Sequence, residues 1–208
     1  PTRSLLFVGP PGVGKTMAAR WLAKNVNRTL YTVDLASIMS SYLGRSGANL
    51  KKVLSAAAND TSVLFLDEFD SVAKRRGDEG DVGELKRLVN VLLQSIDSWP
   101  ESGLLLGATN HPELLDRAIW RRFDRVVQFP MPTRDEIAML ISRKLASAGF
   151  EPSDQVIAAL KVGLEGRSFA DIEIWLNECV RSSVVRDTPL DVILAEKMAG
   201  LFTDQSVE

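Results

Sequence analysis

The chain has 208 residues, of which 45% are hydrophobic and 25% are charged, and its formal net charge is -2 at pH 7. This composition is typical of a globular protein with a buried core, and it excludes a disordered or fibrous chain. The small negative charge gives no strong signal for nucleic acid or an anionic membrane as the main partner, and one histidine and one cysteine exclude a zinc site of the usual His/Cys kind.

The first 130 residues alternate between short apolar segments and stretches with helical spacing. The apolar segments, each predicted to be a strand, are Ser4–Gly9, Leu30–Val33, Val63–Leu66 and Leu104–Ala108. The stretches predicted to be helices are Thr16–Val26, Leu50–Ala58 and Leu85–Ile96. Strands that are apolar on both faces and alternate with helices predict a doubly wound parallel α/β sheet, with ligands bound beyond the carboxyl ends of its strands.

From residue 131 to residue 208 the pattern is helical only, so we expect a small all-helical domain after an α/β domain of residues 1–130. The helices predicted there are Arg134–Ala148, Asp154–Val162, Ala170–Arg186 and Leu190–Ala199. Ser153 and Ser168 are expected to cap two helix starts, and Gly149 is expected to end a helix.

Cys179 is the only cysteine, so it cannot form a disulfide within the chain. We expect it to fill a small apolar site and the protein to work in a reducing compartment, the cytoplasm. No apolar run approaches the ~20 residues that a membrane-spanning helix needs. Because the chain starts at Pro1 without an initiator methionine, it is expected to be a piece of a longer protein.

A phosphate-binding motif lies between the first predicted strand and the first predicted helix. Its pattern is G-x-x-x-x-G-K-[ST], and its residues are Gly9, Pro10, Pro11, Gly12, Val13, Gly14, Lys15 and Thr16, with Met17 next on the helix. Glycines let backbone N–H groups turn toward the phosphates of ATP, and the helix start adds further donors. Lys15 is expected to reach the β- and γ-phosphates, and Thr16 to bind Mg²⁺. The alternative is a Gly/Pro turn with a solvated lysine.

Two acids follow the third predicted strand. Asp67 and Glu68 come directly after Val63–Leu66, so both carboxylates are expected at the sheet edge where the phosphate loop lies. Asp67 is assigned to the Mg²⁺ shell, and Glu68 to polarising the water that attacks the γ-phosphate. Alone, such a pair could open a turn, but the upstream phosphate motif favours ATP hydrolysis.

The two motifs together resemble the AAA ATPases, in the classical branch that includes spastin-like and katanin-like members. The resemblance extends over nearly the whole chain and implies a P-loop NTPase sheet with a helical lid. It also implies that Asn110, after the strand Leu104–Ala108, is the sensor that helps to place the attacking water. An ordinary turn residue is the alternative for Asn110.

Arg121 and Arg122 resemble the arginine-finger segment of these ATPases, which completes the ATP site of a neighbouring subunit. Such a guanidinium stabilises transition-state charge and accelerates GTPases by about 10³- to 10⁵-fold. Of the two, Arg122 is favoured as the finger. The alternative is a pair of surface arginines bound to Asp116 or Asp124.

Tyr42 and Leu43 resemble the loop that lines the central pore of AAA rings and grips extended polypeptide. A tyrosine packed in the core is the alternative. The charged residues 74–79 resemble a second pore loop or are a solvated loop. The chain departs from the family pattern at Ser41, Arg45 and Phe169, and Phe169 stands where a glycine commonly lies near the base of the nucleotide.

The resemblance implies an ATPase that uses ATP and Mg²⁺ and works as a ring of its own copies, six when assembled, to remodel or translocate a polypeptide substrate. An alternative is a nucleotide-dependent assembly switch or nucleic-acid remodeller that does not thread protein. A P-loop kinase that phosphorylates a small acceptor is a third possibility, which the paired acids and paired arginines disfavour.

Overall fold

The structure, a computed structural model, describes residues 2–41, 46–58, 61–71 and 82–204. The chain divides into two compact units, one of Pro1–Pro10 with Gly14–Phe129 and the other of Pro11–Val13 with Pro130–Glu208. The division after Phe129 lies one residue before the boundary expected from the sequence. The tip of the phosphate loop, Pro11–Val13, differs from expectation because it clusters with the second unit.

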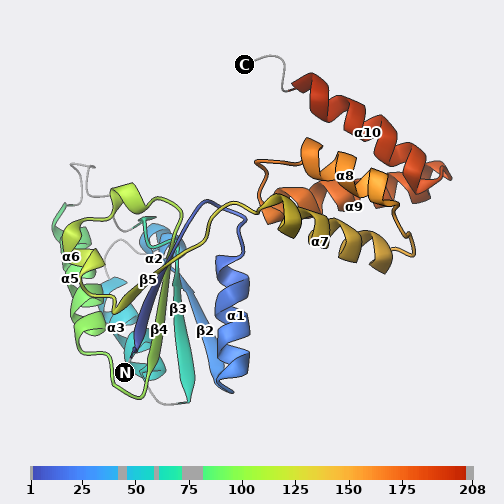
Figure 1. Cartoon of the computed structure of the whole chain (residues 1–208). Coiled ribbons are helices and arrows are strands. Elements are labelled where there is room, and N and C mark those ends of the chain that lie inside the picture. Colours follow the sequence, from blue (N-terminus) through green and yellow to red (C-terminus); the bar gives the residue numbers. More distant parts are fainter. Residues whose placement is uncertain (1, 42–45, 59–60, 72–81, 205–208) are drawn as a thin grey trace. The chain divides into compact units, whose positions relative to one another are not determined.

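A five-stranded sheet in the order β2-β3-β4-β1-β5 forms the centre of the first unit (Figure 1). The strands are β1 (Ser4–Val8), β2 (Thr29–Asp34), β3 (Ser62–Asp67), β4 (Leu104–Thr109) and β5 (Arg125–Gln128). Every pairing between neighbours is parallel, so the predicted fold class is confirmed. In this order β4 lies between β1 and β3.

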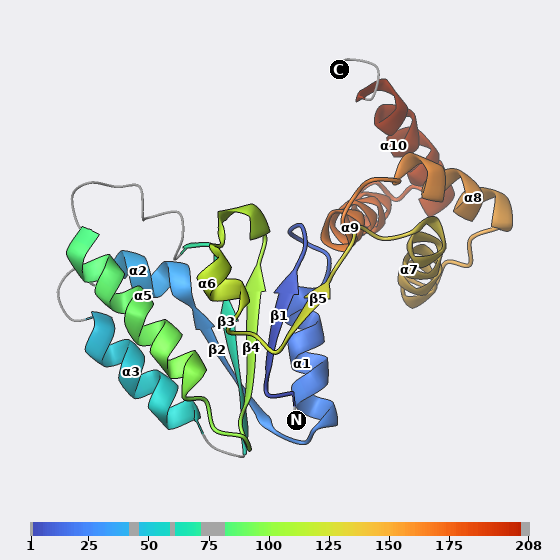
Figure 2. The ribbon, with the colours of Figure 1, turned by 60° about the vertical axis from the view of Figure 1, so that its left-hand side comes forward.

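Helices cover both faces of the sheet. Helix α1 (Lys15–Asn25) packs on one face, and α2 (Leu35–Ser41), α3 (Ser46–Ala57), α5 (Val82–Asp97) and α6 (Arg117–Trp120) lie on the other (Figure 2). Alternate residues of each central strand enter the two cores, since successive side chains of a strand point to opposite faces. Phe65 packs in the core beneath α1, whereas Leu64 and Leu66 pack in the opposite core. A 3-10 turn, η2 (Pro112–Leu114), precedes α6.

The expectation that every strand is apolar on both faces is wrong for the two edge strands. All of β5 is exposed, and Val33 is the only buried residue of β2. Each edge strand has a neighbour on one side only, so fewer side chains of the unit cover it. The central strand β3, in contrast, is buried from Ser62 to Leu66.

The second unit is helical, as the sequence predicts. It contains α7 (Arg134–Ser147), α8 (Asp154–Gly163), α9 (Phe169–Arg186) and α10 (Leu190–Asp204) around an apolar core. The hydroxyls of Ser153 and Ser168 accept hydrogen bonds from N–H groups in the first turns of α8 and α9, so both predicted caps are confirmed. In the part of the chain that the structure describes, no helix is long and apolar enough to cross a membrane.

The loop tip joins the second unit through Gly12. The N–H of Ala170 donates to the carbonyl of Gly12 at 3.1 Å. A Cβ atom at Gly12 would lie 2.3 Å from Oγ of Ser168, and φ at this position is +76°. Only glycine fits such a conformation at such a distance, which explains why these residues cluster with the start of α9.

Candidate nucleotide site

The strand order brings three predicted segments together. Because β4 lies between β1 and β3, the phosphate loop, the acids and Asn110 all follow neighbouring carboxyl ends of the sheet. Gly9 donates its N–H to the carbonyl of Thr109 at 3.4 Å, and Phe69 donates to the carbonyl of Ala108 at 2.8 Å. The segments that follow β1 and β3 are therefore both attached to the end of β4.

Lys15 is a buried cation at the base of the loop. Its side chain is only 7% exposed, and its Nζ donates to the carbonyls of Gly9 at 2.6 Å and Pro10 at 2.7 Å. Burial lowers the pKa of Lys15, and the carboxylates of Asp67 and Asp70 act in the opposite direction. An ammonium held in this way gains strongly when an anion such as a phosphate joins it.

The start of α1 presents backbone donors that no side chain caps. Gly14 is the N-cap residue, has φ of 99° and leaves the helix without a side-chain cap or an acid in its first turn. The first N–H groups of a helix lack partners within the helix and carry its positive dipole end. Together with Lys15, they form a site for an anion.

Thr16 and Asp67 lie side by side. Oγ1 of Thr16 donates to Oδ2 of Asp67 at 3.1 Å, which joins the start of α1 to the end of β3. Asp67 also accepts the N–H of Glu68 through Oδ1 at 2.9 Å. A hydroxyl next to a carboxylate is an oxygen pair suited to Mg²⁺, which binds few protein ligands and keeps phosphate and water as the others. The residues present fit this ion.

Glu68 has an unusual backbone conformation. Its φ is 53°, a left-handed value that non-glycine residues rarely adopt, and it is one of three such residues in the described part of the chain. Its side chain is exposed, whereas Phe69 next to it is fully buried. Strain of this kind costs of order 1–3 kcal/mol and concentrates at functional sites. The turn leaves the Glu68 carboxylate in contact with solvent beyond the sheet.

Asp70 links the acids to Asn110, a connection that the sequence did not reveal. It is only 4% exposed, and its Oδ1 accepts from Oγ1 of Thr109 at 3.1 Å and from the N–H of Asn110 at 3.2 Å. The amide side chain of Asn110 makes no hydrogen bond with a described residue, so it is available to water. The signal that could have identified Asp70 is its place in Asp67-Glu68-Phe69-Asp70, where an acid directly follows an apolar residue.

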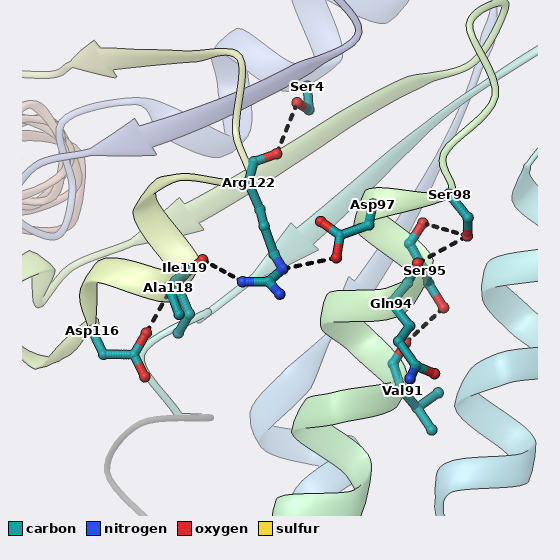
Figure 3. A network of polar contacts seen from close by, with 10 residues as sticks. All are labelled: Ser4, Val91, Gln94, Ser95, Asp97, Ser98, Asp116, Ala118, Ile119 and Arg122. Carbon is teal, nitrogen blue, oxygen red and sulfur yellow. Dashed lines mark hydrogen bonds and ion pairs between the residues drawn. The ribbon is translucent and has the colours of Figure 1, made fainter.

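The two candidate finger residues lie in different environments. Nε of Arg122 donates to Oδ2 of Asp97 at 3.0 Å, and its Nη1 donates to the carbonyl of Ala118 at 2.7 Å (Figure 3). Arg121 is exposed. The alternative pairing is wrong for Arg122, because its carboxylate partner is Asp97 rather than Asp116 or Asp124.

The remaining predicted residues lie in the phosphate loop and α1, at the start of α9, or outside the described residues. Met17 is on α1 with its side chain 66% exposed, whereas Val13 is 4% exposed. Phe169 packs against the core of the second unit as the first residue of α9. Tyr42, Leu43 and the charged residues 74–79 lie outside the described residues, so the pore-loop assignments stay predictions.

Comparison with known proteins decides the family. The family described as "ATPase family associated with various cellular activities (AAA)" matches residues 5–131, which cover the sheet except Ser4 and all of the acids and arginines discussed above. The chain belongs to this family. The sequence-based assignment to the AAA ATPases is confirmed.

Similar proteins include the AAA family ATPase y4kL of Sinorhizobium fredii, 39% identical over 87% of this chain and 54% of that protein. Spastin of Sus scrofa is 35% identical over 83% of this chain and 29% of its own length. The peroxisomal ATPase PEX6 of Candida glabrata is 34% identical over 79% of this chain and 17% of its own. The chain thus spans about half or less of these relatives.

Solved structures support the fold. The crystal structure of the FIGL-1 AAA domain superposes with a TM-score of 0.79 at 25% identity, over 96% of this chain and 71% of that one. A second structure of the FIGL-1 AAA domain, in complex with ADP, has a TM-score of 0.75 over 94% of this chain and 70% of that one, at 24% identity, and shows the fold alone.

Proposed function

We propose that this AAA domain hydrolyses ATP at the ends of β1, β3 and β4 and uses the energy to remodel or translocate polypeptide through the pore of a ring. Hydrolysis rests on one observation, the meeting of a buried lysine, a hydroxyl–carboxylate pair, a strained exposed glutamate and a sensor asparagine at one edge of the sheet. Those residues are Lys15, Thr16, Asp67, Glu68 and Asn110.

Each side chain has a separate task in this proposal. Lys15 and the N–H groups at the start of α1 bind the β- and γ-phosphates. Thr16 and Asp67 would hold Mg²⁺, which neutralises phosphate charge when it is bound. Glu68 accepts a proton from the attacking water, and Asn110 orients that water. The ADP bound in a FIGL-1 AAA domain is in keeping with a nucleotide ligand.

Among the described residues, no hydrogen bond or ion pair holds a cation other than Lys15 at this site, and the ring is proposed because the transition state calls for a further one. An arginine from a neighbouring copy would supply it, and the paired Arg121 and Arg122 are the candidates. A ring would also place Tyr42 and Leu43 around a central channel, where an aromatic side chain can grip an extended chain without reading its sequence.

The hydrolysis step is tested with Glu68→Gln, which keeps the size of the side chain and removes its basicity. We expect turnover to fall by about 100-fold or more while ATP binding remains. The matched control is Glu101→Gln, since Glu101 is an exposed acid remote from the motifs. Unchanged turnover in Glu68→Gln would show that another group activates the water.

The ring and the threading step need two further measurements. Turnover per chain is expected to rise with protein concentration if a neighbour completes the site.

Tyr42→Ala is expected to abolish remodelling of an unfolded protein substrate, and Tyr31→Ala, which alters the exposed tyrosine of β2, is the control. Remodelling that survives Tyr42→Ala favours an assembly switch. Salt-sensitive stimulation by duplex DNA favours a nucleic-acid remodeller, and a phosphorylated acceptor favours a kinase.

A further inference from the structure

The side chain of Arg122 is fixed inside its own chain. Asp97, the last residue of α5, binds its Nε at 3.0 Å, and the carbonyl of Ala118 in α6 binds its Nη1 at 2.7 Å (Figure 3). α6 is a four-residue helix, and the last carbonyls of a helix have no partner within it. The guanidinium therefore joins the end of α5 to an otherwise open carbonyl of α6.

The backbone after Arg121 is fixed as well. The carbonyl of Arg122 accepts from Oγ of Ser4 at 3.5 Å. The ring of Phe123 packs edge-on against the ring of Phe69, with centroids 5.7 Å apart. Gly107 makes room for it, because a Cβ atom there would lie 2.9 Å from Cζ of Phe123. Arg122 and Phe123 thus attach this segment to β1, to β4 and to the residue after Glu68.

Arg121 contrasts with its neighbour. Its side chain is exposed and makes no hydrogen bond or ion pair with any described residue of the chain. The side chain of Arg122 is 29% exposed and that of its partner Asp97 is 51% exposed. To reach another subunit, Arg122 would have to give up both a charge-assisted hydrogen bond and the Ala118 carbonyl, whereas Arg121 would give up nothing.

We infer that Arg122 is a positioning residue, held by Asp97 within its own subunit, and that it presents Arg121 as the residue that reaches the nucleotide of a neighbouring subunit. This inference rests on the proposed ring function, and it reverses the sequence-based preference for Arg122. The Asp97–Arg122 ion pair acts only through Arg121, because it fixes the end of the short helix α6, which Arg121 directly follows.

A double-mutant cycle on the full chain tests this order of action. Turnover is measured at saturating ATP and at a protein concentration where the wild-type rate per chain has reached its plateau. We expect Arg121→Ala to lower kcat by about 10³-fold or more, and Asp97→Asn and Arg122→Ala to lower it less, with KM for ATP unchanged. In the Arg121→Ala background, Arg122→Ala should cause no further loss. Losses that multiply would assign Arg122 its own contact with the phosphate and overturn the inference.

Two controls accompany the cycle. Arg143→Ala, which removes an exposed arginine of α7, and Glu101→Gln, which removes an exposed acid, should leave kcat unchanged. Arg122→Lys keeps a cation that can reach Asp97 and should recover part of the rate lost in Arg122→Ala, whereas Arg121→Lys should not recover the rate lost in Arg121→Ala, since a planar guanidinium is not replaced by an ammonium at a phosphate.

Mixing subunits separates failure of this inference from failure of the proposed ring. Arg121→Ala subunits keep an intact ATP site, and Glu68→Gln subunits keep an intact Arg121, so a mixture should hydrolyse ATP faster than either variant alone. Absence of this recovery contradicts action between subunits and the proposed ring. Recovery together with multiplying losses in the cycle contradicts only the assigned roles of the two arginines.

A labelling experiment tests the ion pair without any need for a ring. Phenylglyoxal should modify Arg121 faster than Arg122 in the wild type, as followed by mass spectrometry of peptides. Asp97→Asn should raise the rate at Arg122 severalfold and leave that at Arg121 unchanged. Equal rates at the two arginines in the wild type would show that Arg122 is not held by Asp97 and would overturn the inference.

Discussion

Thr109 donates its hydroxyl to Asp70 across 3.1 Å, and this hydrogen bond joins the last residue of β4 to the turn that carries Glu68. The same carboxylate oxygen accepts the N–H of Asn110. Glu68, proposed to activate water, and Asn110, proposed to orient it, thus both lie next to one buried acid. Their relative position depends on a residue that touches neither the phosphates nor water in the proposed chemistry.

Replacing Asp70 is therefore expected to impair hydrolysis more than nucleotide binding. Asp70→Ala leaves the hydroxyl of Thr109 and the N–H of Asn110 without their acceptor, which costs about 1–3 kcal/mol of stability for a buried polar group. We expect kcat to fall by about 10-fold or more, on the scale of a lost supporting residue, with little change in ATP affinity. Steady-state kinetics and binding of a fluorescent ATP analogue measure the two effects.

Thr109→Val is the matched variant, since it keeps the shape of the side chain and the bond from Asn110 to Asp70. It removes the hydrogen bond from Thr109 to Asp70 and the acceptor of the N–H of His111. Its effect on kcat should be smaller than that of Asp70→Ala. If Thr109→Val and Asp70→Ala both leave kcat unchanged, Asp70 serves the stability of the turn alone.

Removing the hydroxyl of Thr16 should weaken magnesium dependence. Thr16→Val keeps the branched shape and abolishes the hydrogen bond to Asp67, so the pair that fits the ion loses one oxygen. We expect the free Mg²⁺ concentration that gives half-maximal turnover to rise by about 10-fold or more, whereas Thr16→Ser should behave as the wild type. Titration of turnover with Mg²⁺ tests this expectation, and an unchanged midpoint in Thr16→Val contradicts it.

Two glycines of the phosphate loop should respond differently to alanine. A Cβ at Gly9 would lie 2.0 Å from the carbonyl oxygen of Phe129, whose own N–H is fixed by Val8 at 2.7 Å, so the backbone must move. At Gly14 no atom lies within 4 Å, and only the φ of +99° opposes alanine. We expect Gly14→Ala to cost about 1–3 kcal/mol and Gly9→Ala to cost more.

Urea unfolding of the two glycine variants gives the comparison. Equal losses of unfolding free energy would mean that the loop relaxes away from Phe129 without cost. Gly200→Ala is a useful control, because Gly200 is within helix α10, with no atom near its missing Cβ, and alanine favours helix there.

Local pattern explains what the sequence could predict. The phosphate loop, the acids after β3 and the helical second unit follow from spacing and from motifs whose residues are adjacent in sequence. The edge strand β5 and the four-residue helix α6 carry no such pattern: every residue of β5 is exposed, and α6 is too short for helical periodicity.

The sequence could not predict which side chains far apart along the chain bind each other. Asp97 and Arg122 are 25 residues apart, and Asp70 and Thr109 are 39 residues apart. Each pair exists because the order of the strands brings two chain segments together, and the charges of these residues alone allow several partners. For the same reason the sequence favoured Arg122 over Arg121, since nothing local shows which arginine is already bound.

Cys179 should be unreactive in the folded protein. Its side chain is fully buried in the core of the second unit, and this desolvation raises the pKa of the thiol to about 11. Because the thiolate is the nucleophile, about one molecule in a thousand is reactive at pH 8. We expect a disulfide reagent such as dithionitrobenzoate to modify Cys179 only as fast as the unit unfolds. Rapid modification in the absence of denaturant would contradict the burial.

The same thiol makes stability depend on pH in a defined direction. The pKa of Cys179 is raised by folding from 9.0 to about 11, so the unfolded chain releases the proton first as the pH rises. The stabilisation is complete below pH 9 and is lost by about pH 11, with a total of about 2–3 kcal/mol for a shift of this size. Cys179→Ala removes the titration, although it leaves a small cavity. The difference in unfolding free energy between wild type and Cys179→Ala should therefore shrink between pH 9 and pH 11, and a difference that stays constant over this range would place the thiol in contact with water.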